Sequence, residues 1–481
     1  MKRRDFLMAG TALGVGAVLL PKQQLFANLF NTTATVNQWS FDAGTVYQFQ
    51  DKGLAVLSYA VINNNKEMLL VDPERNPTFY EDLAKTKGAK ITHVIETHPH
   101  ADFVSSHAEM ARKHGATILT SKLAGADYPH QSFDSGDELS FGGFKLEAQN
   151  TPGHSPDGIS IILKDGTSGV GVFTGDTLFV GNVGRPDLRE KAGHTTADAT
   201  ALAGMMYETV QEKIWKWEDQ LLVWPTHGAG SLCGKDISNE LYSNMKKEKA
   251  QNKALNIKDK DKFIKYLTQD PLFIPAYFSL NVQLNKAGAP NYQESLDKVA
   301  TNSGFDQKAI IIDTEGNGSS YWEGGWKLSD GLKFETWLGT VVRPNEDFII
   351  KTRNAKLGDA LKAKVAKIGY EQQLKAVYTE VLPVKKIDLP ALDQSHFKQN
   401  QNAYQIIDVR EKVELAYASP FENSKHIPLS AFRENLDKID LDQPTVIHCA
   451  SGYRSGLAQT MLMDLTAHKE VYDLGSAIRN F

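Results

Sequence analysis

Four short apolar runs are spaced along the first half of the chain, and polar segments separate them. The runs are rich in β-branched and aromatic residues and cover Ile91 to Ile95, Phe144 to Leu146, Val170 to Phe173 and Leu221 to Trp224. Runs of this length and composition predict buried β-strands. A side chain directly after a strand is held by the backbone pairing, so a site built at such strand ends is pre-organised.

The second half of the chain alternates strand-like apolar runs with helical periodicity, and this pattern repeats weakly after about 95 residues. Residues 309–314 (AIIIDT) correspond to residues 405–410 (QIIDVR), and residues 348–352 (FIIKT) correspond to residues 445–449 (TVIHC). In each copy the second run leads to a loop and then to an amphipathic helix. Strands that alternate with helices predict two small parallel α/β domains.

Each predicted helix of the second half has one apolar face. The faces consist of Leu361, Val365 and Ile368 in the first copy, and of Leu457, Ala458, Met461, Leu462 and Leu465 in the second. Spacings of three and four residues place these side chains on one side of a helix, which we expect to face the sheet. Gly369 is expected to end the first helix.

Every apolar run of the first half leads to a polar group that contains metal-binding side chains. The groups are His98-Pro99-His100-Ala101-Asp102, Pro152-Gly153-His154, Gly175-Asp176-Thr177 and Thr226-His227-Gly228. Imidazole and carboxylate groups hold zinc or non-haem iron, and folds bring them together from separate loops. The four groups therefore predict a metal centre at the strand ends.

Residues 40–250 resemble the metallo-β-lactamase superfamily, whose fold is an αββα sandwich. Three stretches resemble persulfide dioxygenases, in particular those fused to rhodanese domains: ETHPHADFVSSH (96–107), FTGDTLFVGNVGRPDL (173–188) and PTHGAGSLCG (225–234). Residues 392–481 resemble a rhodanese domain in the segments Cys449 to Ser455, Asp408 to Arg410 and His426 to Pro428. The resemblance implies an α/β protein in which an αββα sandwich precedes two rhodanese-like three-layer α/β domains.

The expected organisation has five parts. They are a twin-arginine signal segment (1–27), a metallo-β-lactamase-like domain (36–255), a connector (256–290), a degenerate rhodanese-like domain (291–388) and an active rhodanese-like domain (389–481). In the first part Lys2-Arg3-Arg4 precedes an apolar run that is too short to span a bilayer comfortably, a pattern typical of twin-arginine export. We expect a periplasmic protein without stable membrane insertion after signal removal.

For the metal centre, the resemblance assigns these ligands to one Fe(II) ion per chain: His98, His154 and Asp176. Two imidazoles and one carboxylate leave coordination positions for O₂ and a persulfide sulfur. Three further residues would either orient the ligands from an outer shell or bind a second metal: His100, Asp102 and His227. Dinuclear relatives carry a histidine after the aspartate where this chain has Phe103, which favours one metal. Zinc is the alternative cofactor.

Two further residues near these groups are candidates for a role at the metal centre. Arg185 follows Asp176 by a short loop and is predicted to bind a substrate carboxylate, with an ion pair to Asp187 as the structural alternative. Cys233 lies in the loop after His227, and we interpret it as an inert structural thiol.

The loop from Cys449 to Ser455 carries the candidate chemistry of the rhodanese-like part. A loop between a strand and a helix turns backbone N–H groups toward one point, which stabilises a thiolate or a persulfide anion. The resemblance implies that Cys449 is the nucleophile and that Arg454 binds an anion at the loop rim or braces the loop. The first copy has Thr352, Arg353 or Asn354 at the corresponding position, so it cannot carry sulfur covalently.

Composition limits the classes of partner. The 481 residues suggest about three domains, and the net charge of −5 with interleaved acidic and basic residues argues against nucleic acid. The two cysteines cannot form a disulfide framework and are interpreted as thiols. Small-molecule partners remain, and a homo-oligomer is compatible with the sequence.

The resemblance implies a persulfide dioxygenase that uses O₂ to oxidise a low-molecular-weight persulfide, of the glutathione persulfide type, to sulfite and thiol. Rhodanese sulfur transfer through Cys449 would be coupled to this reaction. The expected partners are the persulfide or thiol and O₂. Two alternatives stay open: a dinuclear zinc hydrolase of the glyoxalase II or metallo-β-lactamase type, and a sulfur-carrier or sulfide-responsive binding protein.

Overall fold

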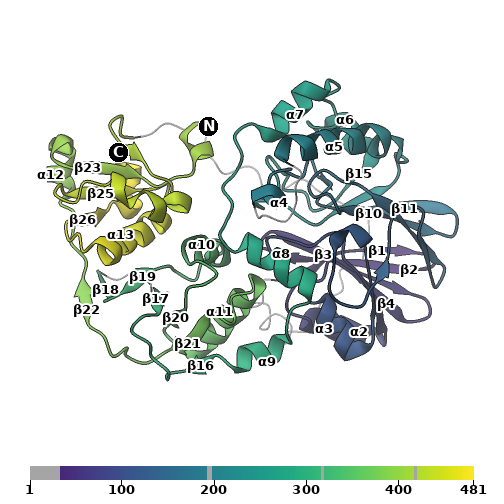
Figure 1. Cartoon of the computed structure of the whole chain (residues 1–481), viewed down its shortest axis with the longest axis horizontal. Helices are drawn as coiled ribbons and strands as arrows, with labels where there is room; N and C mark the ends of the chain where they lie inside the picture. The colour runs from purple at the N-terminus through teal and green to yellow at the C-terminus, as the bar shows by residue number, and fades with distance from the viewer. Residues whose placement is uncertain (1–32, 192–197, 316–318, 417–419) are drawn as a thin grey trace, which may run out of the picture.

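The structure, a computed structural model, describes residues 33–191, 198–315, 319–416 and 420–481 (Figure 1). The predicted signal segment, residues 1–27, lies outside these ranges. Within them, no helix combines the length and the apolar character needed to cross a membrane.

Two β-sheets face each other in the first domain. The seven-stranded sheet follows the chain order and consists of β1 (Thr33–Phe41), β2 (Gly44–Asp51), β3 (Val56–Asn63), β4 (Glu67–Val71), β5 (Lys90–Ile95), β6 (Thr117–Thr120) and β7 (Gln131–Ser132). The six-stranded sheet has the order β15 (Ser243–Asn244), β14 (Leu222–Pro225), β11 (Ser168–Gly175), β10 (Ile159–Asp165), β9 (Phe144–Asn150) and β8 (Glu138–Phe141). The four predicted strands are confirmed as β5, β9, β11 and β14.

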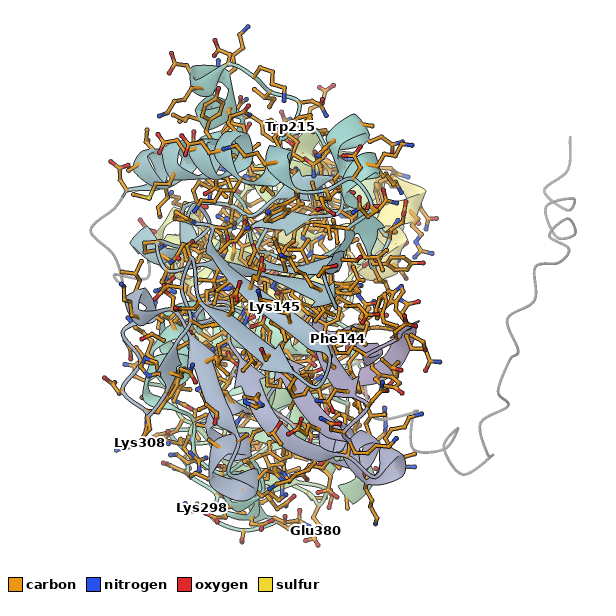
Figure 2. All side chains as sticks on the ribbon, turned by 90° about the vertical axis from the view of Figure 1, so that its right-hand side faces the viewer. Phe144, Lys145, Trp215, Lys298, Lys308 and Glu380 are labelled. Atoms are coloured by element: carbon orange, nitrogen blue, oxygen red, sulfur yellow. The ribbon has the colours of Figure 1, made fainter. Side chains whose placement is uncertain are left out.

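The main core of this domain fills the space between the two sheets. Leu57 and Ile95 of the first sheet meet Leu146 and Trp224 of the second. The alternation that buries them is visible on β9, where Phe144 is buried between the sheets and Lys145 forms an ion pair with Glu138 near the surface. Figure 2 labels Phe144 and Lys145 in the sandwich that faces the viewer. Period-two burial of this kind fixes the register of the strands.

Helices cover the outer face of each sheet. They are α2 (Thr78–Lys87) and α3 (His107–His114) on the first sheet, and α5 (Ala199–Glu212), α6 (Met245–Gln251) and α7 (Lys260–Thr268) on the second. The shorter α4 (Leu188–Lys191) follows a small hairpin of β12 (Leu178–Phe179) and β13 (Asn182–Val183). The layers therefore run helix, sheet, sheet, helix, and the predicted αββα sandwich is confirmed (Figure 1).

The segment predicted as a connector, residues 256–290, is largely helical and packs on the first domain. Its first helix, α7, buries Phe263 and Leu267 in the outer core of the six-stranded sheet. Its second helix is α8 (Phe278–Ala287), whose Asn285 amide donates to the backbone carbonyls of His100 and Phe103, at 2.8 Å in each case. Residues 256–290 thus pack on neighbouring surface, and Asn285 supports the loop that carries His100.

The two copies of the second half share one sheet topology. The first sheet has the order β16 (Ala300–Thr301), β21 (Leu374–Tyr378), β20 (Phe348–Lys351), β17 (Ile310–Asp313) and β19 (Gly325–Lys327), and the second has β26 (Val471–Asp473), β25 (Thr445–His448), β23 (Gln405–Asp408) and β24 (Lys425–His426). From β21 to β19 the strands correspond one by one to those from β26 to β24, and all of these pairs are parallel. A small hairpin of β18 (Ser320–Trp322) and β22 (Lys386–Asp388) adds to the first copy. The predicted internal repeat is confirmed.

The helices of the second half are α9 (Tyr292–Asp297), α10 (Phe334–Val341), α11 (Ala355–Lys367), α12 (Gln394–Gln399) and α13 (Tyr453–Thr466). The predicted apolar face of α11 is buried, and Gly369 follows its end with φ of 71°. On α13 one residue differs from the prediction, because Leu465 is 39% exposed. It lies in the last turn of α13, and hydrophobic spacing does not show where the packing beneath a helix ends.

Candidate functional site

Four strand ends bring the predicted metal-binding groups to one edge of the sandwich. β9 and β11 both run antiparallel to β10, and β14 runs parallel to β11, so these three strands end at the same edge. His154, Asp176 and His227 follow them. His98 follows β5 of the opposite sheet, so the site forms where the two sheets meet.

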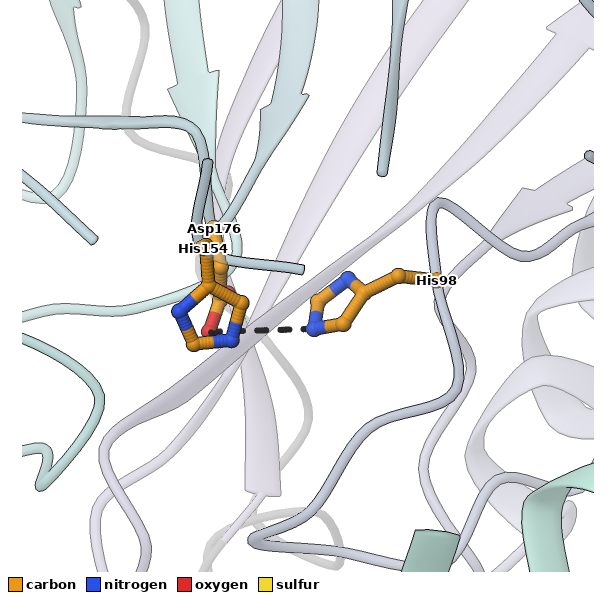
Figure 3. Close-up of side chains that lie close together, drawn as sticks. All are labelled: His98, His154 and Asp176. Atoms are coloured by element: carbon orange, nitrogen blue, oxygen red, sulfur yellow. Dashed lines mark ion pairs between the residues drawn. The ribbon is translucent and has the colours of Figure 1, made fainter. Parts of the chain in front are cut away.

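His98, His154 and Asp176 form the candidate metal centre, as the sequence predicts (Figure 3). Nε2 of His154 lies 3.3 Å from Oδ2 of Asp176, and Nε2 of His98 lies 3.9 Å from the same oxygen. Nδ1 of His154 donates to the backbone carbonyl of Arg185 at 2.9 Å, which leaves Nε2 of the neutral ring as an acceptor. The Nδ1 atom of His98 also has a protein partner, because it lies 3.1 Å from Oγ1 of Thr97.

The electrostatics of these three side chains suit a bound cation. Burial, together with the neighbouring His100, lowers the pKa of His98 well below its usual value, and burial also lowers the pKa of His154. Burial alone would raise the pKa of Asp176, but the nearby imidazoles of His227 and His154 hold it well below its usual value. Among the described residues none donates a hydrogen bond to either Asp176 oxygen, although the carboxylate is buried. A buried carboxylate that accepts no hydrogen bond is costly, so the donor set fits a metal ion.

A second group of potential ligands faces the other oxygen of Asp176. Nε2 of His227 lies 3.4 Å from Oδ1 of Asp176 and 3.4 Å from Oδ2 of Asp102. Burial opposes protonation of His227, but Asp102 and Asp176 raise its pKa to about 9. Cys233 completes this group, with its thiol within 4.8 Å of the ligand atoms of Asp102 and His227. The sequence placed Cys233 in the loop after His227 and favoured an inert structural thiol, whereas the structure groups it with potential ligands.

His100 lies away from this second group. Its ring is 4.2 Å from the ring of His98 and 4.3 Å from that of Phe103, measured between centroids. Its Nε2 lies 3.1 Å from Oδ1 of Asp72, which also accepts the Thr97 backbone N–H at 2.8 Å. His100 therefore supports the loop that carries His98. Asp72, at the end of β4, was missed in the sequence because a single aspartate after a strand carries no distinctive pattern.

Arg185 is fully engaged by protein groups. Its Nε and Nη2 donate to the two oxygens of Asp187, at 2.7 Å each. Its remaining N–H groups donate to the carbonyls of Leu272 (2.6 Å), Leu232 (3.2 Å) and Phe273 (3.3 Å). A guanidinium has five N–H donors, and all five are used here. This geometry supports the ion pair with Asp187, and nothing in it supports the predicted contact with a substrate carboxylate.

We expect Arg185→Lys to lower metal affinity about 10–100-fold, the usual cost of losing a group that orients a ligand. Lysine has one point charge and cannot replace the five-donor fork, so the Arg185 backbone carbonyl that holds His154 would shift. Metal titration of the apoprotein measures the effect, and Arg343→Lys, at an exposed ion pair with Glu434, serves as the control. Unchanged metal affinity together with a raised KM for the substrate would instead support a substrate contact.

Cys449 lies at the end of β25, in the loop that leads into α13. Its Sγ accepts the backbone N–H of Gly452 at 3.1 Å and lies 3.5 Å from Oγ of Ser455. Arg454 forms a two-pronged ion pair with Glu414, whose Oε1 accepts from Nη2 at 2.7 Å. Of the two roles that the sequence left open for Arg454, this geometry supports bracing of the loop.

A cavity of about 640 Å³ opens at Cys449. It is lined by Arg410, Pro420, His448, Cys449, Ala450, Ile478, Arg479 and Phe481. Cys449 itself is 1% exposed, so a reactant has to enter this cavity to reach the sulfur. Arg410 is paired with Asp408 at 2.6 Å, so Arg479 is the arginine of this lining that suits an anionic sulfur donor or acceptor.

The first copy has no side chain that could replace Cys449. Thr352 follows β20 at the corresponding position and is buried, and the side chain of Asn354 caps α11 by accepting the Leu357 N–H at 2.9 Å. The predicted loss of covalent sulfur chemistry in this copy therefore agrees with the geometry.

Two sequence families match the chain. Residues 51–222 match the metallo-beta-lactamase superfamily, and residues 393–481 match the rhodanese-like domain. The chain thus carries a metallo-β-lactamase domain and a C-terminal rhodanese domain. Over the metallo-β-lactamase part its homologues include persulfide dioxygenases.

Three similar proteins illustrate the likeness. The mitochondrial persulfide dioxygenase of Bos taurus is 26% identical over 198 residues, which is 41% of this chain and 72% of that protein. The hydroxyacylglutathione hydrolase of Brucella ovis is 33% identical over 132 residues, which is 27% of this chain and 50% of that protein. The crystal structure of a metallo-beta-lactamase from Staphylococcus aureus superposes with a TM-score of 0.65 at 28% identity and covers 70% of this chain and 100% of that one.

Proposed function

We propose that the chain is a persulfide dioxygenase that oxidises a low-molecular-weight persulfide, of the glutathione persulfide type, and transfers sulfur through Cys449. In the first reaction a persulfide RSSH, O₂ and water give RSH, sulfite and two protons. The S–S bond breaks, and the outer sulfur loses four electrons to O₂. The observation that carries the proposal is the convergence of His98, His154 and Asp176, two neutral imidazoles and one carboxylate whose oxygens lack hydrogen bonds from described residues.

A ferrous ion held by these three side chains would supply the redox chemistry with O₂ that zinc lacks. The chain's own residues would orient and enclose the reactants. Arg189 donates to the carbonyl of Pro99 at 3.1 Å and to Asp157 at 2.9 Å, which steadies the loop of His98. His227 would hold a proton on Nε2 between the carboxylates of Asp102 and Asp176. The burial of all these groups excludes bulk water and strengthens their electrostatic interactions.

Sulfur transfer through Cys449 would proceed in two displacements. The Cys449 thiolate attacks the outer sulfur of thiosulfate or another donor, the donor's S–S bond breaks, and sulfite or the corresponding leaving group departs. An acceptor thiolate then attacks the outer sulfur of the Cys449 persulfide and releases the Cys449 thiolate. The Gly452 N–H would stabilise the anionic sulfur in both states.

A dinuclear zinc hydrolase is the second candidate, and one observation favours it. Asp102, His227 and Cys233 form a second buried set of donors on the other side of Asp176. This set would hold a second zinc ion, and the similarity to a hydroxyacylglutathione hydrolase points the same way.

Metal content and O₂ consumption distinguish the two candidates. The full chain is purified without oxygen, its metals are quantified, and O₂ uptake is followed with glutathione persulfide and, separately, hydrolysis with S-lactoylglutathione. We expect one iron per chain and persulfide-dependent O₂ uptake that yields sulfite. Two zinc ions with thioester cleavage and no O₂ uptake would replace this proposal with the hydrolase.

We further propose a periplasmic location after twin-arginine export, on the basis of Lys2-Arg3-Arg4 and the apolar run that follows. Fractionation of cells that express the full chain tests it, with Arg3→Lys/Arg4→Lys as the export-deficient comparison. Finding the unaltered chain in the cytoplasm alone would contradict it.

A further inference from the structure

Helix α10 of the cysteine-free copy lies between the two domains that carry the reactive groups (Figure 1). The residue before it, Lys333, donates from Nζ to the carbonyl of Gly230 at 3.0 Å and to that of Gly53 at 3.3 Å. Gly230 belongs to the loop between His227 and Cys233. Two buried ion pairs add to this contact, Arg75 with Glu371 at 2.7 Å and Lys367 with Asp51. The cysteine-free copy is thus fixed firmly to the metal-binding domain.

Trp337, in the middle of α10, contacts the segment between α7 and α8, to which Phe273 belongs. The ring of Phe273 stacks on Trp337, with the ring centroids 5.4 Å apart and the planes at 16°. The backbone carbonyl of Phe273 accepts from Arg185, and the Arg185 carbonyl accepts from the metal-ligand candidate His154. A continuous series of contacts therefore runs from His154 through Arg185 and Phe273 to Trp337.

Trp337 also contacts the loop of Cys449. The guanidinium carbon of Arg454 lies 5.6 Å from the centroid of the Trp337 ring, within the range of a cation–π interaction. The neighbouring Tyr453 donates its hydroxyl to the carbonyl of Ser329, in the same copy as Trp337, at 3.0 Å. Both contacts hold the turn where the Cys449 loop enters α13. Glu414 is the other group that holds the Arg454 guanidinium, and it lies in the rhodanese domain itself.

We infer that Trp337 is a positioning residue for the Cys449 loop. The cysteine-free copy would then serve to hold this loop in a fixed position relative to the metal-binding domain. The inference rests on the proposed sulfur transfer through Cys449. Trp337 is only 8% exposed, and its ring contacts both Phe273 of the metal-binding side and Arg454 of the rhodanese side. An aromatic face is required for both contacts, whereas an aliphatic side chain could fill the volume but hold neither partner in orientation.

Replacing the aromatic ring while keeping the bulk tests the inference. We expect Trp337→Leu to lower kcat for sulfur transfer from thiosulfate to cyanide about tenfold, because small displacements of a reactive group are costly. Trp337→Phe should restore most of the rate. Phe273→Leu, which removes the ring that stacks on Trp337, should also lower kcat. Trp322→Leu is the matched control, since Trp322 is a buried tryptophan of the same copy with a cation, Lys386, over its ring.

A second measurement keeps the test independent of the proposed activity. The rate at which iodoacetamide alkylates Cys449 in each variant, followed by mass spectrometry across pH, reports the surroundings of the thiol directly. We expect the pH profile of this rate to change in Trp337→Leu and to be retained in Trp337→Phe. If the unaltered chain transfers no sulfur, the proposed function fails, and the alkylation profiles still decide on Trp337. Equal effects of Trp337→Leu and Trp322→Leu, or unaltered alkylation and transfer in Trp337→Leu, would overturn the inference.

Discussion

His98→Ala is expected to abolish persulfide-dependent O₂ uptake and to leave sulfur transfer through Cys449 largely intact. The variant loses one of three ligand candidates. The loss of metal affinity should therefore exceed the roughly 10–100-fold that follows removal of a residue that only orients a ligand. His98 belongs to the first domain, and its contacts with Asp176 and Thr97 lie within that domain. One preparation serves for three measurements: its metal content, its O₂ uptake with glutathione persulfide, and its sulfur transfer from thiosulfate to cyanide.

His114→Ala is the matched control for this experiment. His114 is also a histidine of the first domain, but it ends α3, is partly exposed and pairs with Glu81 at 2.8 Å. It should keep the metal and both activities. O₂ uptake that persists in His98→Ala would contradict the ligand assignment. A His98→Ala variant that only loses stability, from a chain that consumes no O₂, would instead support the sulfur-carrier alternative.

The metal centre could be predicted because its residues follow strands, and strands have a readable pattern. Apolar runs before His98, His154 and Asp176 indicated where the backbone would hold each side chain. The sequence could also predict the repeat of the second half, since buried parallel strands are nearly continuous apolar runs. The matching strand orders of the two copies follow from that pattern.

For Arg185 and Cys233 the sequence left two roles open and could not decide between them. Arg185 is held by carbonyls of Leu232, Leu272 and Phe273, and a backbone carbonyl carries no residue-type signal. Cys233 joins Asp102 and His227 only because the loop after β14 folds back to the site. The helical character of residues 256–290 was missed as well, since its charged residues resemble those of a linker. In each case tertiary contacts decided what local sequence left open.

Cys449→Ser is expected to abolish sulfur transfer while O₂ uptake with added glutathione persulfide remains near the level of the unaltered chain. A serine hydroxyl can keep the hydrogen bonds with Gly452 and Ser455, so the loop should hold its shape. The hydroxyl is not ionised near neutral pH and forms no persulfide, so the first displacement cannot occur. Cyanide-dependent thiocyanate formation and mass spectrometry of the sulfur-loaded chain measure the loss.

A coupled assay with the same variant shows whether the two domains act in sequence. With thiosulfate and glutathione as the sole source of persulfide, the unaltered chain should consume O₂, whereas Cys449→Ser should not. Added glutathione persulfide should restore O₂ uptake in the variant, because the metal centre is intact. Mixing Cys449→Ser with His98→Ala then separates two routes: restored uptake means that persulfide diffuses between chains, and its absence means transfer within one chain. Thiosulfate-dependent uptake in Cys449→Ser alone would contradict the role of Cys449.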